Sequence, residues 1–217
     1  RKGKASKDPE GWAKWEATMR EANIPEWYID SCRKIKYMFP KAHACAYVMS
    51  AIRIAWFKVY KPIYYYASYF SIRSDDFDIE TMIKGYDAIK SKMEDIKLKG
   101  FEASNKESNI LTTLEIALEA TARGIEFANV DLYKSESRNF IVSSDDDMTL
   151  IPPFRTIDGL GEAVSKAIVE EREKQEFISI EDLQKRCKVS VTIIDKMRTM
   201  GILEGLPESS QMTLNLF

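Results

Sequence analysis

The chain has 217 residues, of which 45% are hydrophobic and 30% charged, a composition typical of one or two mainly helical globular domains. Three widely spaced cysteines and a single histidine argue against a disulfide framework or a zinc site. The same cysteine pattern favours a reducing cytoplasm. No apolar run is long enough to cross a bilayer, so no membrane is expected as a partner. The net charge of −2 conceals a basic block, because residues 1–70 carry 13 basic and 6 acidic side chains.

The first third of the chain predicts four helices, separated by proline. Asp8 is a suitable cap for the first helix, and the second begins near Pro25. Pro40 separates the second helix from a long one that runs to about Tyr60, and Pro62 permits the next. Ahead of these helices, the opening residues "RKGKASKDPE" are typical of the interior of a protein, so a longer parent chain is expected.

The middle of the chain predicts two more helices and then a change of period. Ser74 is predicted to cap a helix that ends near Gly100, and another helix is predicted to end at Gly124. Short segments rich in β-branched and aromatic residues then predict a small β element over 126–151. Short helices are expected over 152–206, and 207–217 is expected to be an extended tail. The predicted fold is therefore mainly α.

A glycine-rich turn carries the most specific local signal. Gly159 and Gly161 flank Leu160, and a helical pattern follows directly. The amides of such a turn, with the N-terminus of the next helix, can hold one phosphate, and Lys166 would add a positive charge. The pattern resembles a helix-hairpin-helix element, which binds the backbone of a duplex without reading bases. The alternative is an ordinary helical corner in which the glycines serve packing.

The segment "SIEDLQKRCKVSVTIIDKMRTMG" has the features of a degenerate second copy. Its turn lacks glycine, and Lys188 and Ser190 would contact phosphate in place of glycine amides. The alternative is that this helical pair only packs against the first copy.

The long helix that follows Pro40 begins with a second candidate site. Lys41 and His43 lie at its N-terminal end, where the helix dipole favours anions, and Tyr47 falls on the same face as His43. A phosphate near the two basic groups and a flat base against the tyrosine would use all three side chains. The alternative is a core helix with a buried histidine.

Two other stretches are interpreted as structural. The aromatic run "YYYASYF" is expected to lie in the core, and the acidic turn "SSDDD" is expected to be a solvated loop, although it could bind a cation.

The end of the chain, "QMTLNLF", presents apolar side chains after a polar run. Termini are usually polar, so this pattern favours a peptide that binds a groove on a partner. Its apolar side chains are Leu214, Leu216 and Phe217, and Gln211 precedes them. The alternative is a terminal strand that folds back on its own domain.

Together, the segments "KIKYMFPKAHACAY", "YYASYF" and "LIPPF…IDGLGEAVSKAIV" and the tail closely resemble the PolC-type DNA polymerase III α subunit of low-GC Gram-positive bacteria. The resemblance covers essentially the whole chain and is most specific at "FPKAHACAY". It implies a C-terminal part of a bacterial cytoplasmic enzyme, a DNA-directed DNA polymerase.

The resemblance also implies an architecture. Residues 1–125 would be the last part of the fingers, 126–151 a connector, 152–206 the duplex-binding domain and 207–217 the attachment to a sliding clamp. The palm, with the aspartates that hold Mg²⁺, would lie upstream of this chain, as would the thumb, the PHP domain and the 3′–5′ exonuclease.

Within that architecture, the resemblance assigns further roles. In the tail, Gln211 would bind a small polar pocket of the clamp, and Leu214, Leu216 and Phe217 would fill an apolar one. The basic stretch at the start of the chain would face the triphosphate of the incoming dNTP, and Phe39 and Tyr47 would lie near the nascent base pair formed on primer-template DNA. The residues implied to contact nucleotide are Arg1, Lys2, Lys4, Phe39, Lys41, His43 and Tyr47. No catalytic residue and no metal ligand is expected in this chain.

Two other functions stay open from the residues alone. One is a stand-alone helix-hairpin-helix accessory protein of repair or recombination. The other is a purely structural helical interaction domain.

Overall fold

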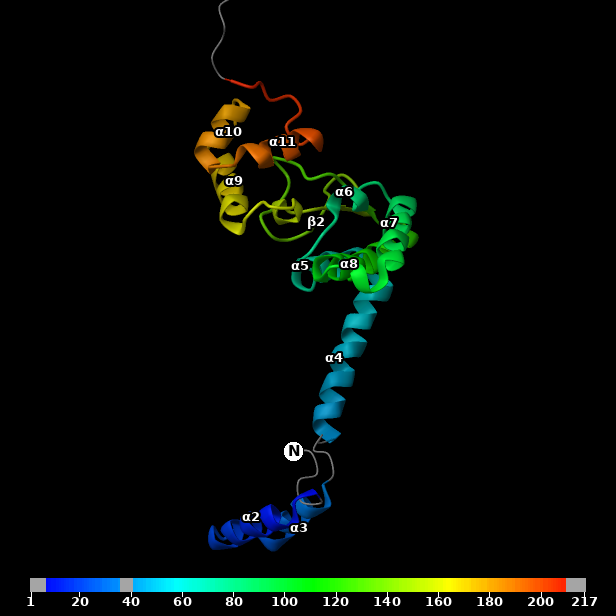
Figure 1. Cartoon of the computed structure of the whole chain (residues 1–217), viewed down its shortest axis with the longest axis vertical. Helices are drawn as coiled ribbons and strands as arrows, with labels where there is room; N and C mark the ends of the chain where they lie inside the picture. The colour runs from blue at the N-terminus through cyan, green and yellow to red at the C-terminus, as the bar shows by residue number, and fades with distance from the viewer. Residues whose placement is uncertain (1–6, 36–40, 210–217) are drawn as a thin grey trace, which may run out of the picture. The chain divides into compact units, whose positions relative to one another are not determined.

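A computed structural model describes residues 7–35 and 41–209 of the chain (Figure 1). Contacts between residues divide the chain into two compact units, 1–54 and 55–217. The boundary predicted near residue 125 lies inside the second unit, so the functional division at that point stays a prediction.

The first unit contains two short helices and most of a long one, α2 (Pro9–Glu21), α3 (Glu26–Lys34) and α4 (Lys41–Tyr60). Asp8 caps α2 as predicted, because its side chain accepts a hydrogen bond from the Gly11 amide at 2.9 Å. Two ion pairs join the helices: Glu16 of α2 pairs with Arg33 of α3, and Arg20 of α2 pairs with Glu26 of α3 at 2.7 Å.

The second unit is larger and mainly helical. Its helices are α5 (Pro62–Ile72), α6 (Ile79–Met82), α7 (Tyr86–Lys99), α8 (Asn105–Ala122), α9 (Glu162–Lys174), α10 (Ile180–Cys187) and α11 (Val191–Thr199), with the 3₁₀ turns η1 (Gly100–Glu102) and η2 (Phe154–Thr156). None of the helices in the described residues is long and apolar enough to cross a membrane.

The β element predicted over 126–151 is a small three-stranded sheet. Its strands are β1 (Glu126–Phe127), β2 (Ile141–Val142) and β3 (Thr149–Ile151), in the order β1-β3-β2. The central strand pairs in parallel with β1 and antiparallel with β2. Helices α5 and α8 lie on one side of this sheet and α9 to α11 on the other (Figure 1).

The aromatic run of α5 forms the core against the sheet, as expected. Tyr66 and Phe70 are fully buried. The Phe70 ring lies 5.4 Å from the ring of Phe127 and 5.4 Å from that of Phe140, measured between centroids. Stacked and edge-on aromatic contacts at such distances stabilise a core beyond the area that they bury. One continuous core thus runs from α5 through the sheet to α11.

The helix predicted between Ser74 and Gly100 is wrong in its start and in its continuity. Ser74 is buried and caps no helix; Asp78 caps α6 instead, by accepting from the Thr81 amide at 3.2 Å. The helix then breaks at Gly85, whose φ of +83° only glycine adopts readily, and α7 begins after it. The helix therefore divides at an internal glycine that the periodic pattern did not reveal.

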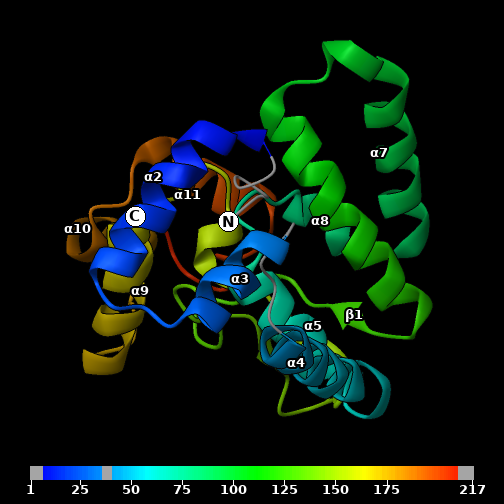
Figure 2. The ribbon, with the colours of Figure 1, turned by 90° about the horizontal axis from the view of Figure 1, so that it is seen from below.

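Helices α7 and α8 form an antiparallel pair that projects from the rest of the second unit (Figure 2). The start of α8 is fixed by a capping box, in which the Ser104 hydroxyl accepts from the Glu107 amide and the Glu107 carboxylate accepts from the Ser104 amide. The hydrogen bond from Lys99 and those from Ser104 lower the pKa of Glu107 to about 2. Gly124 follows α8 at φ +82°, so this helix ends where the sequence predicted.

Candidate nucleic-acid interface

The glycine turn joins η2 to α9 and is called the first hairpin, residues 159–161. Gly159 has φ +88°, a left-handed conformation that explains the need for glycine. Leu160 is buried and anchors the turn, and its amide donates to the Ile157 carbonyl at 3.0 Å. Gly161 is the N-cap of α9, and a Cβ added to it would meet no heavy atom within 4 Å. The turn therefore leaves its outer face open at the N-terminus of a 13-residue helix.

The segment between α10 and α11, residues 188–190, is called the second hairpin and repeats this conformation. Lys188 has φ +55°, Val189 is buried, and Ser190 is the N-cap of α11. The backbone angles of the two N-caps agree within one degree, at φ −69° and ψ 154° for the first and φ −70° and ψ 155° for the second. The structure therefore supports the interpretation of two related copies, the second without glycine.

The helices that follow the two hairpins also correspond. Positions three, four and seven residues after each N-cap point inward, and they are Val164, Ser165 and Ile168 in α9 and Ile193, Ile194 and Met197 in α11. Matching inward positions mean that the two copies pack into one core. The second copy therefore packs against the first, and it also presents a similar turn, at which a phosphate contact stays a prediction.

Most basic side chains of residues 152–209 are engaged within the protein. Ion pairs involve Arg155, Lys166, Lys174, Lys185, Arg186, Lys196 and Arg198. Arg172 donates to the carbonyls of Leu132 and Ser135. Among the described residues of this range, Lys188 is the one basic side chain with neither a hydrogen bond nor an ion pair. The unpaired ammonium group found among these described residues thus lies in the second hairpin.

Lys166, expected to add charge at the first hairpin, is bound to Glu162 at 2.9 Å. Glu162 begins α9 and also lies 3.8 Å from Arg138. These two cations hold the pKa of Glu162 below its usual value, with the Lys166 hydrogen bond the larger cause. The first hairpin therefore offers amides, while Lys166 already has an anionic partner.

Three of the residues predicted to contact nucleotide lie in the described part of α4. Lys41 is its first helical residue, and the ring centroids of His43 and Tyr47 lie 4.5 Å apart. All three side chains are exposed. Arg1, Lys2, Lys4 and Phe39 lie outside the described residues, as do Gln211, Leu214, Leu216 and Phe217 of the tail.

Helix α4 differs from the core helix considered as an alternative. It has no buried residue, although large apolar side chains occur all around it. Those exposed by about half or more are Tyr47, Val48, Met49, Ile52, Ile54, Trp56, Phe57, Val59 and Tyr60. A helix that is hydrophobic on all sides is normally covered on all sides, so α4 presents an apolar surface of the kind that packs against other polypeptide.

Comparison with known proteins finds a helix-hairpin-helix match in the part of the chain that contains both hairpins. Residues 124–212 match a helix-hairpin-helix motif family. The chain is 56% identical over 200 residues to the PolC-type DNA polymerase III of Bacillus subtilis, a match that covers 92% of the chain. It is 54% identical over 215 residues, 99% of the chain, to the PolC-type enzyme of Lactococcus lactis, and 51% identical over 214 residues to that of Oceanobacillus iheyensis.

The chain belongs to the PolC-type DNA polymerase III family. The match covers 13–14% of the length of these relatives, so the chain spans about one seventh of a PolC-type protein. The resemblance seen in the sequence is thereby confirmed, and so is the mainly helical fold with a helix-hairpin-helix domain. The roles of single residues within the family stay predictions.

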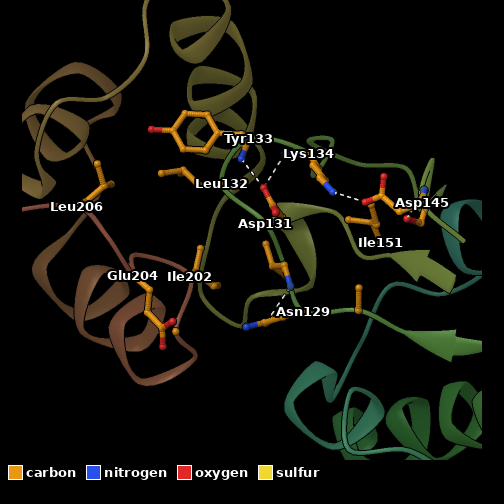
Figure 3. Close-up of a pocket in the computed structure, with 14 residues that line it drawn as sticks. Asn129, Asp131, Leu132, Tyr133, Lys134, Asp145, Ile151, Ile202, Glu204 and Leu206 are labelled. Atoms are coloured by element: carbon orange, nitrogen blue, oxygen red, sulfur yellow. Dashed lines mark hydrogen bonds and ion pairs between the residues drawn. The ribbon is translucent and has the colours of Figure 1, made fainter.

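A cavity of this PolC-type segment is lined by residues outside both hairpins (Figure 3). It has a volume of about 450 Å³ and lies between the 128–134 loop and the 201–206 turn. Lys134 in its wall pairs with Asp145 at 2.7 Å, and Asp131 accepts from the amides of Tyr133 and Lys134. These polar groups already satisfy one another, so the cavity carries no obvious chemistry.

Carboxylates of the acidic turn "SSDDD", residues 143–147, also form local contacts. Besides the Asp145 pair, Asp146 accepts from the Met148 amide and from the Thr149 hydroxyl. Within residues 7–35 and 41–209, no group of three histidine, cysteine or carboxylate side chains is arranged to hold a metal ion. The donor set of the described residues therefore does not fit a Mg²⁺ site.

One cluster beside the first hairpin was missed by sequence reasoning. Asp158, which precedes Gly159, binds Lys106 of α8 at 2.6 Å and Lys196 of α11 at 3.3 Å. These lysines lie 52 and 38 residues away in sequence. No periodicity joins such distant positions, and the only available signal was the carboxylate next to the glycine turn.

Proposed function

We propose that this chain is part of a replicative DNA-directed DNA polymerase of the bacterial cytoplasm. In this proposal it contributes nucleotide contacts, sequence-independent binding of duplex DNA and attachment to a sliding clamp. The observation that carries the proposal is 51–56% identity to PolC-type polymerases over 92–99% of the chain, in a structure with two matching hairpins. Its partners would be primer-template DNA, the incoming dNTP, the clamp and the palm, thumb, PHP and exonuclease domains.

The duplex-binding role belongs to residues 152–206. The amides of Gly159, Leu160 and Gly161 and the N-terminus of α9 would hold one phosphate, and Lys188 and Ser190 a second. Because phosphate contacts carry no base information, this part of the polymerase would bind all sequences alike. The open face at Gly161 and the free ammonium of Lys188 support this role.

The nucleotide-contacting role belongs to the first unit. Lys41 and His43 would position the triphosphate and offset its charge in the transition state, and Tyr47 would lie near the new base pair. The apolar surface of α4 supports this placement, because a fingers helix would be covered by polymerase domains outside this chain. When bound, Mg²⁺ would be held by the palm, and it would activate the attacking hydroxyl and neutralise the phosphates.

Replacing Lys41 or His43 with alanine in the full polymerase is expected to lower kcat/KM for dNTP. A roughly tenfold loss, or about 1.4 kcal/mol of transition-state binding, is expected for each. Template affinity should change little, because neither side chain faces the duplex in this proposal. Steady-state incorporation kinetics and primer-template titration measure the two quantities.

Lys14→Ala is the matched control, since Lys14 is an exposed lysine of α2 in the same unit. It should leave both quantities unchanged. A collapse of template binding in Lys41→Ala or His43→Ala, with an unaltered dNTP KM, would show that the fingers role is wrongly placed.

The clamp role belongs to residues 207–217. The chain reaches Ser209 along the start of α10, where the Ile180 amide donates to the Pro207 carbonyl at 2.9 Å and the Glu181 amide donates to the Glu208 carbonyl at 3.1 Å. The apolar side chains of Leu214, Leu216 and Phe217 would supply affinity of roughly 1.5–3 kcal/mol each before ordering costs.

Phe217→Ala in the full polymerase is expected to reduce clamp-dependent primer extension by about tenfold or more. Extension without the clamp should be unchanged, because the Phe217 side chain would contact only the sliding clamp. A processivity assay with and without clamp measures both. Loss of clamp-free activity or of thermal stability would instead favour a tail that folds back on its own domain.

A further inference from the structure

Lys196 of α11 reaches from the second copy to the backbone of the first. Its Nζ donates to the Asp158 carbonyl oxygen at 2.8 Å and contacts Asp158 Oδ2 at 3.3 Å. The other carboxylate oxygen, Oδ1, accepts from Lys106 Nζ at 2.6 Å. The peptide group that opens the first hairpin is thus held by a side chain of the other hairpin's helix.

This contact fixes the direction of a hairpin amide. In a trans peptide the carbonyl of one residue and the N–H of the next point in opposite directions, and no cis bond occurs in the described residues. Holding the Asp158 carbonyl toward Lys196 therefore turns the Gly159 N–H away from α11. Gly159 needs such a holder, because glycine rotates easily between backbone conformations and would let this peptide plane turn.

The position of Lys196 favours this role over a direct phosphate contact. Its side chain is one-third exposed, and its ammonium already binds two oxygens of Asp158. The Lys106 hydrogen bond, with help from Lys196, holds the pKa of Asp158 below its usual value, so the carboxylate stays ionised at neutral pH. The lysine is therefore paired with an anion that would repel a phosphate at the same place.

We propose that Lys196 is a positioning residue for duplex binding, which orients the Gly159 amide of the first hairpin through the Asp158 carbonyl. The second copy then serves the first, whether or not its own turn reaches DNA. The inference rests on the proposed duplex-binding function of the hairpins.

The test uses the full polymerase with Lys196→Met, which keeps most of the aliphatic stem and removes the ammonium. Affinity is measured for primer-template DNA with a series of duplex lengths, at several salt concentrations. For duplexes long enough to reach the hairpins we expect an affinity loss of about three- to tenfold, the value of one such hydrogen bond. The slope of log K against log salt should not change, because no phosphate contact is lost.

Three variants complete the design. Lys196→Arg keeps a donor and should restore the affinity. Lys106→Met removes only the carboxylate contact and should have a smaller effect. Lys185→Met is the matched control, because Lys185 is an exposed lysine of α10 paired with Glu181.

Two outcomes would overturn the inference. A drop of about 0.9 in the salt slope of Lys196→Met would make Lys196 a direct phosphate contact. Unchanged long-duplex affinity in this variant, while Gly161→Val weakens it, would show that the lysine has no positioning role. If Gly161→Val and Lys196→Met both leave long-duplex affinity unchanged, the duplex-binding function itself fails.

Discussion

Replacing Arg155 with alanine should destabilise the second unit by about 3 kcal/mol or more, because it leaves several carbonyls without a donor. Arg155 Nη2 donates to the carbonyls of Phe70, Ser71 and Ser74, at 3.0, 3.1 and 3.0 Å. Its Nε donates to the Arg138 carbonyl at 2.9 Å. Phe70 and Ser71 lie in the last turn of α5, and the last carbonyls of a helix lack amide partners within the helix. Arg155 supplies donors to these two carbonyls.

Arg155 also joins two parts of the unit that are distant in sequence. It belongs to η2, which leads into the first hairpin, and its guanidinium lies 5.2 Å from the centre of the Phe77 ring. Its side chain is only 13% exposed, so water cannot replace the lost donors freely. Breaking this contact should therefore loosen α5 and the hairpin together.

Hydrogen exchange of the full polymerase, read in peptides from α5 and η2, measures the effect. Arg155→Ala should accelerate exchange in both segments. Arg155→Lys should give an intermediate result, because an ammonium lacks the planar fork that reaches several carbonyls at once. Arg73→Ala, an exposed arginine at the end of α5, is the matched control. Equal exchange in Arg155→Ala and Arg73→Ala would contradict the role given to Arg155.

Gly161→Val should separate folding from duplex binding. The Gly161 backbone, at φ −69°, suits any residue, and no atom lies within 4 Å of a Cβ placed there. The variant should therefore keep its stability within about 1 kcal/mol, the usual cost of a poor N-cap. A branched side chain on the open face should block the approach of a phosphate, and we expect at least a roughly tenfold loss of long-duplex affinity, about 1.4 kcal/mol.

Gly159→Ala is the companion variant. Gly159 has φ +88°, where a side chain costs about 1–2 kcal/mol, and its Cβ would lie 3.4 Å from Ile193 Cδ1. This variant should lose stability as well as affinity. Thermal unfolding and titration with primer-template DNA of increasing duplex length measure the two properties. Full duplex affinity in Gly161→Val would favour the structural interaction domain considered from the sequence alone.

The hairpins show why counting charges along a sequence misjudges a binding surface. Residues 151–217 contain nine basic side chains, yet Lys188 alone is free among those described. The guanidinium groups of Arg155 and Arg172 donate to backbone carbonyls instead. Lysines such as Lys166 pair with acidic residues one helical turn away. Duplex binding here should therefore depend on amides more than on charge, with a shallow dependence on salt.

Local chemistry was enough to predict several elements from the sequence. The Asp8 cap, the helix break at Pro62 and the helix end at Gly124 depend on residues within a few positions of one another. The same is true of the first hairpin, where the glycine with positive φ and the buried Leu160 follow from three consecutive residues. The helix over 74–100 failed because the periodicity continued across Gly85, where the backbone turns.

By itself, the sequence determined the helical class, the small β element, the first hairpin and membership of the PolC-type family, because each is written in short motifs and their order. The tertiary structure decided that the second hairpin repeats the first without glycine, since Lys188 adopts a positive φ at the end of α10 although its residue type does not favour it. It also decided which charged side chains form ion pairs or hydrogen bonds within the protein. Contacts such as Lys196 with Asp158 join residues 38 apart, and only the folded chain brings them within 3 Å.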